Sequence, residues 1–294
     1  MTPQSPGRAT ATATIPALFA VLLVVDSLHF VFARALLPFL PPEMSSFLML
    51  GIAAVQVGVF QAYRGKLRWR AFLDHWRFYT AIGLLVATST IIDYNAVAFI
   101  DPGTASLLSR AAVLFSLAFG LFWLGERLRP TELLGAALAV VGVVIISFQP
   151  GDFLRFGSLL ALISSFLYAL HTAIVKRHGE GIDFGDFFLF RIATIAFFLL
   201  LFTLARGQMV RPSPMGWLLA ALAATVDVVI SRSLFYLSLR RMPMSIHTII
   251  LTLSPVVTIL WSFALFQSAP SMLGFAGGAL VIAGVALVTL WRRA

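Results

Sequence analysis

PGTASLLSRAAVLFSLAFGLFWL, residues 102–124, is the stretch that decides the fold class of this chain. Its side chains are predominantly apolar or small, and Arg110 is the one charged residue among them. An α-helix of about 20 such residues crosses the hydrocarbon core of a bilayer, which is about 30 Å thick. Similar stretches, separated by proline, glycine and charged residues, predict ten membrane-spanning helices. They cover residues 15–37, 42–63, 76–99, 102–124, 130–148, 156–177, 185–206, 213–239, 243–266 and 271–291.

The composition of the whole chain agrees with this prediction. Of its 294 residues, 60% are hydrophobic and 11% are charged, whereas about 25% of a typical soluble domain is charged. A water-soluble globular enzyme and a disordered chain are therefore both excluded. The absence of cysteine excludes disulfides, a thiolate zinc site and a cysteine nucleophile. Residues 1–14 form a short polar tail, and we expect the first span to be retained because it is too long for a signal-peptide core.

Lysine and arginine residues fall mostly in alternate loops, and this sets the expected orientation. The loop between the second and third spans carries Arg64, Lys66, Arg68, Arg70 and Arg77. Because cytoplasmic loops are enriched in such residues, we expect both chain termini on the cytoplasmic side of the cell inner membrane. The loop also contains aromatic residues, as nucleic-acid patches do, but an anchor at the anionic bilayer surface explains it better. No nucleic-acid partner is expected.

A shift of 142 residues aligns the two halves of the sequence without a gap. It brings His29 onto His171 and Tyr94 onto Tyr236. The matching glycines lie in the fifth and tenth spans, where small residues pack helices closely: Gly135 with Gly277, and Gly142 with Gly284. Each half, residues 15–148 and 156–291, then contains five spans. Because five is odd, the second half enters the membrane from the opposite side, which is an inverted-topology repeat typical of secondary transporters.

The end of the first half resembles a known family. Ala105-Ser106-Leu107-Leu108-Ser109-Arg110, followed by Leu124-Gly125-Glu126-Arg127-Leu128, is similar to the fourth span of EamA proteins, in the drug/metabolite transporter superfamily, and to the LGE sequence that ends it. Ser254-Pro255 resembles the corresponding pair of their second repeat. The chain departs from the family pattern at Phe266-Gln267-Ser268, in place of a second LGE, and at Val113, in place of a proline. The resemblance implies a secondary transporter that exports small polar metabolites, amino acids first.

Ionisable residues inside the predicted spans are the best indicators of a binding site, because a charge in hydrocarbon is costly unless it faces a cavity or a partner. Asp26 and Asp227 lie at the middle of the first and eighth spans and suit a substrate amine or a carried proton. Arg110 suits a carboxylate or phosphate group. The alternative for each is a structural ion pair. The aspartates can pair with Arg34, Arg110 or Arg232, and Arg110 can pair with Asp93. The predicted substrate-binding residues are Asp26, His29, Tyr94, Arg110, Tyr168, His171, Asp227 and Arg232.

Histidine and tyrosine residues in this set have competing explanations. The repeat relates His29 to His171, so the two can line both sides of one pathway, or each can simply make a hydrogen bond between helices. Tyr94 and Tyr168 lie on polar helix faces and can contact an ammonium group by cation–π interaction, or pack in the core. Arg191 is close to a span end, where we expect its side chain to extend to the membrane surface.

Asp227 is the first candidate for proton coupling. Ser231, four residues later, can hydrogen-bond it, and no basic residue lies three or four residues away on either side. Asp26 is the second candidate, because Arg34 shares its helix face and can hold it ionised. Pro255 is a hinge candidate, since a proline within a span frees a backbone carbonyl group.

Sequence motifs of nucleotide-binding and catalytic sites are missing from the chain. It has no Gly-rich phosphate loop, no His-Glu-x-x-His helix and no Gly-x-Ser-x-Gly turn. We therefore expect no enzymatic activity, no cofactor and no metal, and transport that runs on gradients. The expected partners are a small-molecule substrate and the lipid bilayer, and the oligomeric state stays open, a monomer included. The alternative functions are a lipid or headgroup flippase, a membrane-embedded enzyme, and a structural subunit without a pathway.

Overall fold

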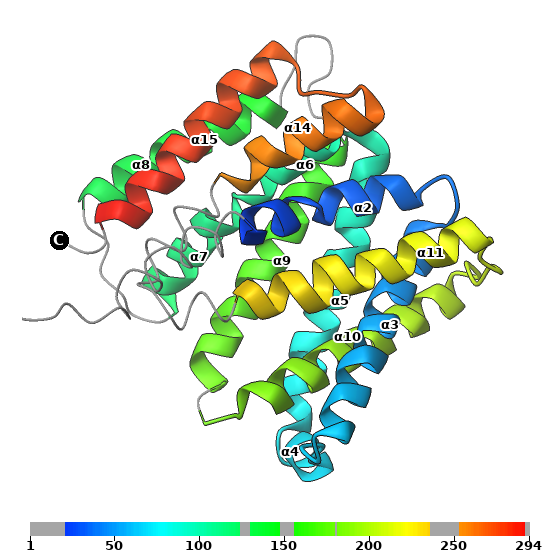
Figure 1. The fold of residues 1–294 in the computed structure, drawn as a ribbon. Helices are drawn as coiled ribbons and strands as arrows, with labels where there is room; N and C mark the ends of the chain where they lie inside the picture. Colours follow the sequence, from blue (N-terminus) through cyan, green and yellow to red (C-terminus); the bar gives the residue numbers. More distant parts are fainter. Residues whose placement is uncertain (1–20, 124–129, 148–155, 180, 236–252, 292–294) are drawn as a thin grey trace, which may run out of the picture.

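The computed structural model describes residues 21–123, 130–147, 156–179, 181–235 and 253–291 (Figure 1). Within these ranges every regular element is a helix and no strand occurs, so the all-α prediction is confirmed there. Residues 21–27 are helical. They are followed by α2 (His29–Leu36), α3 (Pro42–Tyr63), α4 (Trp69–Asp74), α5 (Trp76–Phe99), α6 (Pro102–Ser109), α7 (Ala112–Phe122), α8 (Pro130–Ser147), α9 (Phe156–His178), α10 (Phe184–Ala205), α11 (Pro214–Ala223), η1 (Ala224–Ser231), α14 (Ser254–Phe266) and α15 (Met272–Trp291).

Six helical stretches in the described ranges are long and apolar enough to cross a membrane. They are Pro42–Tyr63, Trp76–Phe99, Pro102–Phe122, Phe156–His178, Phe184–Ala205 and Pro214–Phe235, and they coincide with six of the predicted spans. Shorter apolar helices are Leu133–Ile146, Ser254–Phe266 and Met272–Leu287. The predicted spans 15–37 and 243–266 lie partly outside the described residues. Large apolar side chains such as Val55 and Phe197 are exposed on the outside, as expected for a surface in contact with lipid.

Local sequence rules explain where several of these helices begin. The carboxylate of Asp101 accepts a hydrogen bond from the backbone N–H of Thr104 at 2.8 Å, which caps α6. Pro102 follows at the first helical position, where its missing N–H has no cost. The hydroxyl of Ser213 caps α11 in the same way, by accepting from the N–H of Gly216 at 3.1 Å.

Two of the predicted spans are irregular in the middle. Between α6 and α7, the N–H groups of Arg110 and Ala111 bond to carbonyl groups three residues earlier, at 3.2 and 2.9 Å, which tightens the helix into a 3₁₀ turn. In the eighth predicted span, α11 continues into η1, which is a π-helix. Segments of π-helix are rare and often occur at functional sites. The two irregular segments contain Arg110 and Asp227, both of which are predicted site residues.

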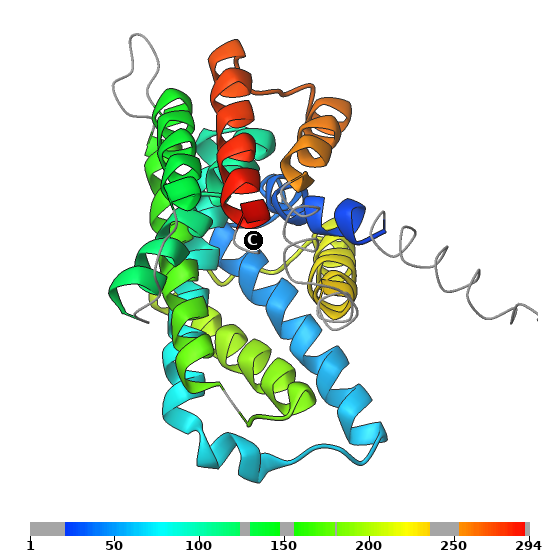
Figure 2. The same ribbon diagram turned by 90° about the vertical axis from the view of Figure 1, so that its left-hand side faces the viewer.

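The helices form a layered bundle with distinct edges (Figures 1 and 2). Helices α8 and α15 lie side by side at one edge, and α3 and α10 lie together at the other. Between them, α5 packs against both α9 and α10, while α14 packs on α6. Helix α3 also contacts η1, which brings the π-helical segment into the interior.

Helices α8 and α15 approach each other backbone to backbone. A Cβ atom added at Gly142 would lie 2.5 Å from the carbonyl oxygen of Gly277, and one added at Gly284 would lie 2.4 Å from that of Gly135. Such distances leave no room for a side chain. The glycine faces of the fifth and tenth predicted spans therefore pack directly on each other.

Helix boundaries recur at the interval of 142 residues found in the sequence. The shift carries both ends of α3 onto both ends of α10. Each helix is followed by a glycine in the left-handed conformation, Gly65 with φ 65° and Gly207 with φ 64°. After it, the N–H of Lys66 bonds to a carbonyl five residues earlier at 2.9 Å, and that of Gln208 does the same at 3.0 Å. Both helices thus end in the same Schellman turn.

Candidate functional site

A cavity of about 80 Å³ lies among α2, α3, α5, α9, α10 and η1. Its charged and titratable lining consists of His29, Asp93, Arg191, Asp227 and Arg232. The remaining lining is mostly apolar: Met49, Leu50, Val86, Ser89, Thr90, Tyr168, Ile192, Ile195 and Val228. The cavity therefore offers two acids and two arginines to a bound molecule, within an otherwise apolar wall.

Asp227 is paired with His29 across the cavity wall. The Nδ1 atom of His29 lies 2.7 Å from Oδ2 of Asp227, and the aspartate is only 2% exposed. The other carboxylate oxygen, Oδ1, has no hydrogen-bond partner, and neither does the hydroxyl of Ser231. The expected hydrogen bond between Ser231 and Asp227 is thus absent. The partner comes instead from α2, a helix nearly 200 residues away in the sequence.

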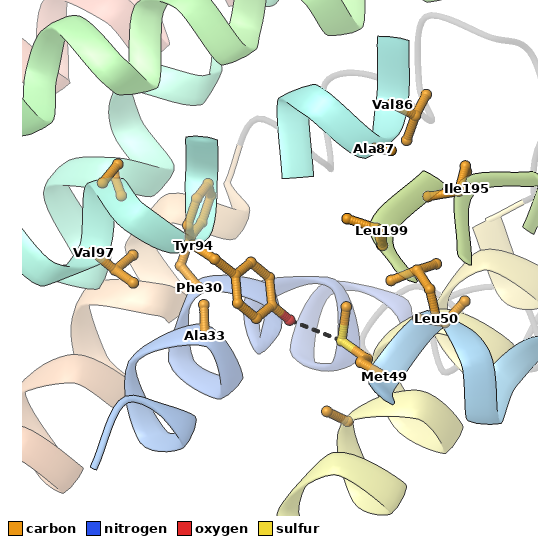
Figure 3. Close-up of a cluster of buried hydrophobic side chains, with 14 of the residues drawn as sticks. Phe30, Ala33, Met49, Leu50, Val86, Ala87, Tyr94, Val97, Ile195 and Leu199 are labelled. Atoms are coloured by element: carbon orange, nitrogen blue, oxygen red, sulfur yellow. Dashed lines mark hydrogen bonds between the residues drawn. The ribbon is translucent and has the colours of Figure 1, made fainter. Parts of the chain in front are cut away.

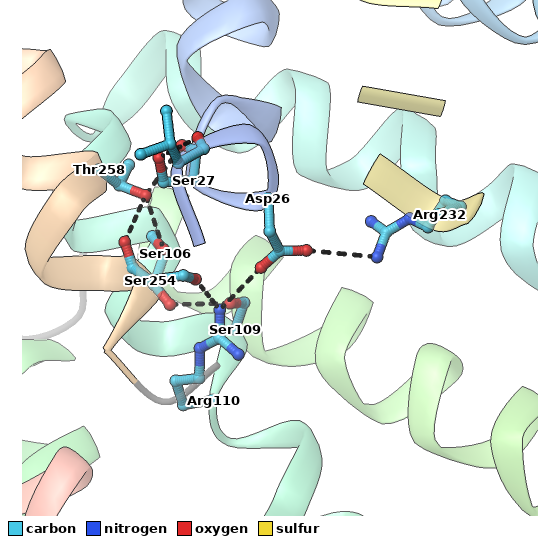
Figure 4. Close-up of polar contacts among 9 residues, drawn as sticks. Asp26, Ser27, Ser106, Ser109, Arg110, Arg232, Ser254 and Thr258 are labelled. Atoms are coloured by element: carbon cyan, nitrogen blue, oxygen red, sulfur yellow. Dashed lines mark hydrogen bonds and ion pairs between the residues drawn. The ribbon is translucent and has the colours of Figure 1, made fainter. Parts of the chain in front are cut away.

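Asp26 forms the centre of a second polar group, the Asp26 cluster, which consists of Asp26, Arg110, Arg232 and Ser254 (Figure 4). Its Oδ1 atom lies 3.5 Å from Nη1 of Arg232, and its Oδ2 atom lies 3.9 Å from Nη2 of Arg110. Arg110 also donates a hydrogen bond to the hydroxyl of Ser254. Arg34, the partner expected from the shared helix face, instead donates to the backbone carbonyl of Val97. Arg232 belongs to this cluster and also lines the cavity, so it links the two groups.

A hydroxyl network next to the Asp26 cluster joins three helical segments (Figure 4). The hydroxyl of Thr258 on α14 lies 2.9 Å from the carbonyl oxygen of Ser27 and 3.3 Å from the hydroxyl of Ser106 on α6. Pro255 occupies the first turn of α14, where proline starts a helix without kinking it. Its predicted role as a hinge stays a prediction, because residues 236–252 lie outside the described ranges.

Arg191 is a residue whose position was predicted wrongly. It is only 7% exposed and lines the cavity, whereas its sequence position suggested a side chain extended to the membrane surface. Its Nε atom donates to Nε2 of His171 at 3.3 Å. His171 is itself buried, and its ring centroid lies 5.4 Å from that of Tyr168. A signal was present in the sequence: Arg191 is the eighth residue of α10, about 10 Å along the helix at 1.5 Å per residue.

Tyr94 lies in the packed core beside the cavity (Figure 3). It is fully buried, and its hydroxyl donates to the sulfur of Met49 at 2.9 Å. Its ring meets that of His29 edge to face at a centroid distance of 6.1 Å. Tyr94 therefore supports the His29–Asp227 pair from behind.

The structure divides the predicted site residues into two sets. Four of them line the cavity: His29, Tyr168, Asp227 and Arg232. Four others lie behind its wall or in the Asp26 cluster: Asp26, Tyr94, Arg110 and His171. Asp93 and Arg191 line the cavity without having been in the predicted set. In the described part of the chain, no group of three or more histidine and acidic residues could hold a metal ion.

Comparisons with known proteins agree with the fold of a membrane transporter. Residues 14–148 and 155–290 both match the sequence profile of the EamA-like transporter family. A "Probable terminal-alkyne amino-acid exporter" of Streptantibioticus cattleyicolor is 28% identical over 66% of this chain and 67% of its own length. A "Probable amino-acid metabolite efflux pump" of Escherichia coli is 28% identical over 53% of this chain and 52% of its own. The chain thus spans between about half and two thirds of these relatives.

A solved crystal structure shares the architecture along nearly the whole chain. It superposes with a TM-score of 0.67 over 96% of this chain and 99% of its own, at 20% sequence identity. At that identity the likeness concerns the fold alone.

Proposed function

We propose, from the premise that this chain belongs to the EamA-like transporter family, that it is a secondary exporter of small zwitterionic metabolites, amino acids first, in the cell inner membrane. The chain is a multi-pass membrane protein. The observation that carries the proposal is the cavity with acids and arginines on one apolar wall. The printed names of two relatives, an amino-acid exporter and an amino-acid metabolite efflux pump, support the choice of substrate class and direction.

The charge balance of the cavity favours a zwitterion over a simple ion. Asp93 and Asp227 can attract an ammonium group, while Arg191 and Arg232 can attract a carboxylate. A cavity for a bare cation needs an acidic excess, and one for an anion needs a basic excess, because an unmatched charge is costly in a low-dielectric interior. An α-amino acid brings both charges within one small group and leaves its side chain to the apolar wall.

The proposed architecture is ten spans in two inverted five-helix repeats, residues 15–148 and 156–291, after a polar tail of residues 1–14. The coincident bounds and identical C-terminal turns of α3 and α10 support it. So do the glycine contacts between α8 and α15, since the shift of 142 residues exchanges one contact for the other.

Ion pairs at both ends of α3 and α10 support the same architecture. At one end, Nη1 of Arg206 lies 2.9 Å from Oε1 of the buried Glu43. At the other end, Nη2 of Arg68 lies 2.6 Å from Oδ2 of the buried Asp186. In each pair, an arginine beyond the end of one helix contacts an acid in the first turn of the other, although the shift of 142 residues carries Arg206 onto Arg64 and not onto Arg68. Such an exchange of roles between the two helices is compatible with a twofold axis in the membrane plane. We place Arg68, and with it both termini, on the cytoplasmic side, because its loop is rich in basic residues.

Transport is proposed to be driven by protons, with Asp227 as the carrier and Asp26 as the second candidate. The short contact between His29 and Asp227 can hold one proton between a base and a carboxylate. Asp93 and Arg232 face this pair from α5 and from the end of η1, so a substrate ammonium that binds beside it competes with the proton. Asp26 already has two arginine partners, Arg110 and Arg232, which makes it the second candidate.

The test is transport by purified protein in liposomes. Efflux of a radiolabelled neutral amino acid should follow an imposed pH gradient, and exchange of labelled for unlabelled amino acid should proceed without one. Asp227→Asn should abolish the first and spare the second, whereas Asp74→Asn, at an exposed position of α4, should change neither. A wild-type protein that moves no amino acid in either direction overturns the proposed function. A D227N variant that still follows the pH gradient overturns the assignment of the proton carrier.

A further inference from the structure

Arg191 differs from the other arginines of the site in having no acidic partner. Arg232 and Arg110 share Asp26, and at the helix ends Arg206 and Arg68 contact Glu43 and Asp186. Arg191 is more than nine-tenths buried, and the one polar contact of its side chain in the described structure is the hydrogen bond from Nε to His171. Its two terminal nitrogens make no hydrogen bond there. A buried cation without a counter-ion is unfavourable. The cavity that Arg191 lines is therefore suited to bind an anionic group that would serve as its counter-ion.

The geometry of the guanidinium group indicates which anionic group fits beside Arg191. Its terminal N–H groups form a planar fork that matches the two oxygens of a carboxylate. His171 fixes the orientation of the fork: Nε2 of the imidazole accepts from Nε of Arg191, so the ring is neutral at that nitrogen and adds no second charge. The same hydrogen bond uses the Nε–H group and leaves the two terminal nitrogens, Nη1 and Nη2, for a ligand. His171 is thus a positioning residue for Arg191.

We propose that Arg191 is the anchor for the substrate carboxylate, an inference that rests on the proposed function and specifies its substrate. The acids of the cavity come from other helices, Asp93 from α5 and Asp227 from η1. Since Asp227 is already paired with His29, Asp93 is the cavity acid that can bind the substrate ammonium group. The preferred substrates are therefore α-amino acids.

The apolar part of the wall selects among amino acids. Ile192 and Ile195 follow Arg191 on α10, and Val86, Leu50 and Val228 complete the surface. A side chain without charge fits this wall, because a charged one would lose its hydration without gaining a partner. Leucine is accordingly a suitable test substrate.

The first experiment measures the thermal unfolding of the detergent-purified protein without any ligand. Because Arg191→Gln removes an uncompensated buried charge, the variant should unfold at the same temperature as wild type or higher. Arg34→Gln serves as the matched control, since Arg34 lies in the bundle outside the cavity wall and donates to a backbone carbonyl. A marked loss of stability in R191Q would mean that Arg191 has a structural partner, and this would overturn the proposal.

The second experiment compares leucine with two analogues that each lack one charged group. Isopentylamine has no carboxylate, and 4-methylpentanoate has no ammonium group. R191Q should raise the KM for leucine counterflow in liposomes by at least about tenfold, as expected for the loss of a charge-assisted hydrogen bond, and should leave inhibition by isopentylamine unchanged. R191K should retain part of the leucine affinity. His171→Asn should raise the KM for leucine less than R191Q, and His171→Phe, which offers no acceptor, should raise it more than His171→Asn.

The outcomes separate the two proposals. If wild type transports leucine or another neutral amino acid and R191Q does so with unchanged KM, the role of Arg191 is overturned and the proposed function stands. If wild type transports isopentylamine as well as leucine, the cavity does not need a carboxylate, and Arg191 is again not its anchor. If wild type transports no amino acid, the proposed function fails and the inference fails with it.

Discussion

A single methyl group at Gly142 should separate α8 from α15. An alanine Cβ there would lie 2.5 Å from the carbonyl oxygen of Gly277 and 2.7 Å from the backbone nitrogen of Val281. Ordinary contacts begin at 3.4 Å, so the two backbones must move apart by about 0.9 Å. A gap of that size forfeits about a quarter to a half of the dispersion energy of each neighbouring contact. Overpacking of this kind typically costs about 1–3 kcal/mol.

The net effect must include the helix propensity of the new residue. Alanine is favoured over glycine in a helix by up to about 1 kcal/mol. We therefore expect Gly142→Ala to destabilise the protein by up to about 2 kcal/mol. The matched control is Gly58→Ala in α3, where the nearest atom to an added Cβ is Cδ1 of Leu189 at 3.7 Å. That variant should be as stable as wild type or more stable.

Unfolding of the detergent-purified variants, by heat and by sodium dodecyl sulfate, measures both effects. Gly284→Ala should behave like Gly142→Ala, because its Cβ would lie 2.4 Å from the carbonyl oxygen of Gly135. The double variant should cost less than the two single variants combined, since helices that have already moved apart accommodate the second methyl group. A Gly142→Ala variant as stable as Gly58→Ala would refute the close backbone contact.

Three further predictions concern topology and the buried polar groups. A cysteine in place of Lys66, the one thiol in a chain without native cysteine, should react with a membrane-impermeant maleimide only in opened cells; reaction in intact cells would reverse the orientation. Arg206→Gln leaves the buried Glu43 without its cation and should lower stability by about 1–2 kcal/mol, since the arginine end of the pair is exposed; an unchanged unfolding midpoint would show that the pair contributes nothing. Tyr94→Phe removes the hydrogen bond to Met49 and should cost under about 1 kcal/mol of stability with the same KM for transport; a changed KM would show that the hydroxyl contacts the substrate.

Hydropathy and small-residue patterns predicted a large part of the fold. Six predicted spans coincide with long apolar helices, and the glycines of the fifth and tenth spans do pack against each other. These features depend on composition and spacing within one segment, which a sequence displays directly. The alternative in which Asp26 forms an ion pair with Arg110 or Arg232 could also be foreseen, because a charge inside a span needs a partner at similar depth.

The partners across helices could not be predicted in the same way. Which side chains meet depends on the rotation and tilt of each helix, and these result from packing of the whole bundle. Ser231 has the right spacing from Asp227 for an α-helix, but the segment is a π-helix and the partner is His29. Arg191 was assigned from its distance to the span end, while the direction in which it points depends on how α10 packs against α5 and α3.

The π-helical segment would allow part of the eighth predicted span to turn about its own axis. A π-helix is locally one residue longer per turn than an α-helix, and one residue of an α-helix corresponds to about 100° of rotation. If that extra residue were passed along the chain, the stretch it crosses would turn by about 100° about its own axis while the ends of the span stayed where they are. Asp227 lies inside this segment and Arg232 directly after it. Such a turn would move Asp227 away from His29 and Arg232 away from Asp26 at the same time. One change of helical pitch would therefore break both ion pairs together.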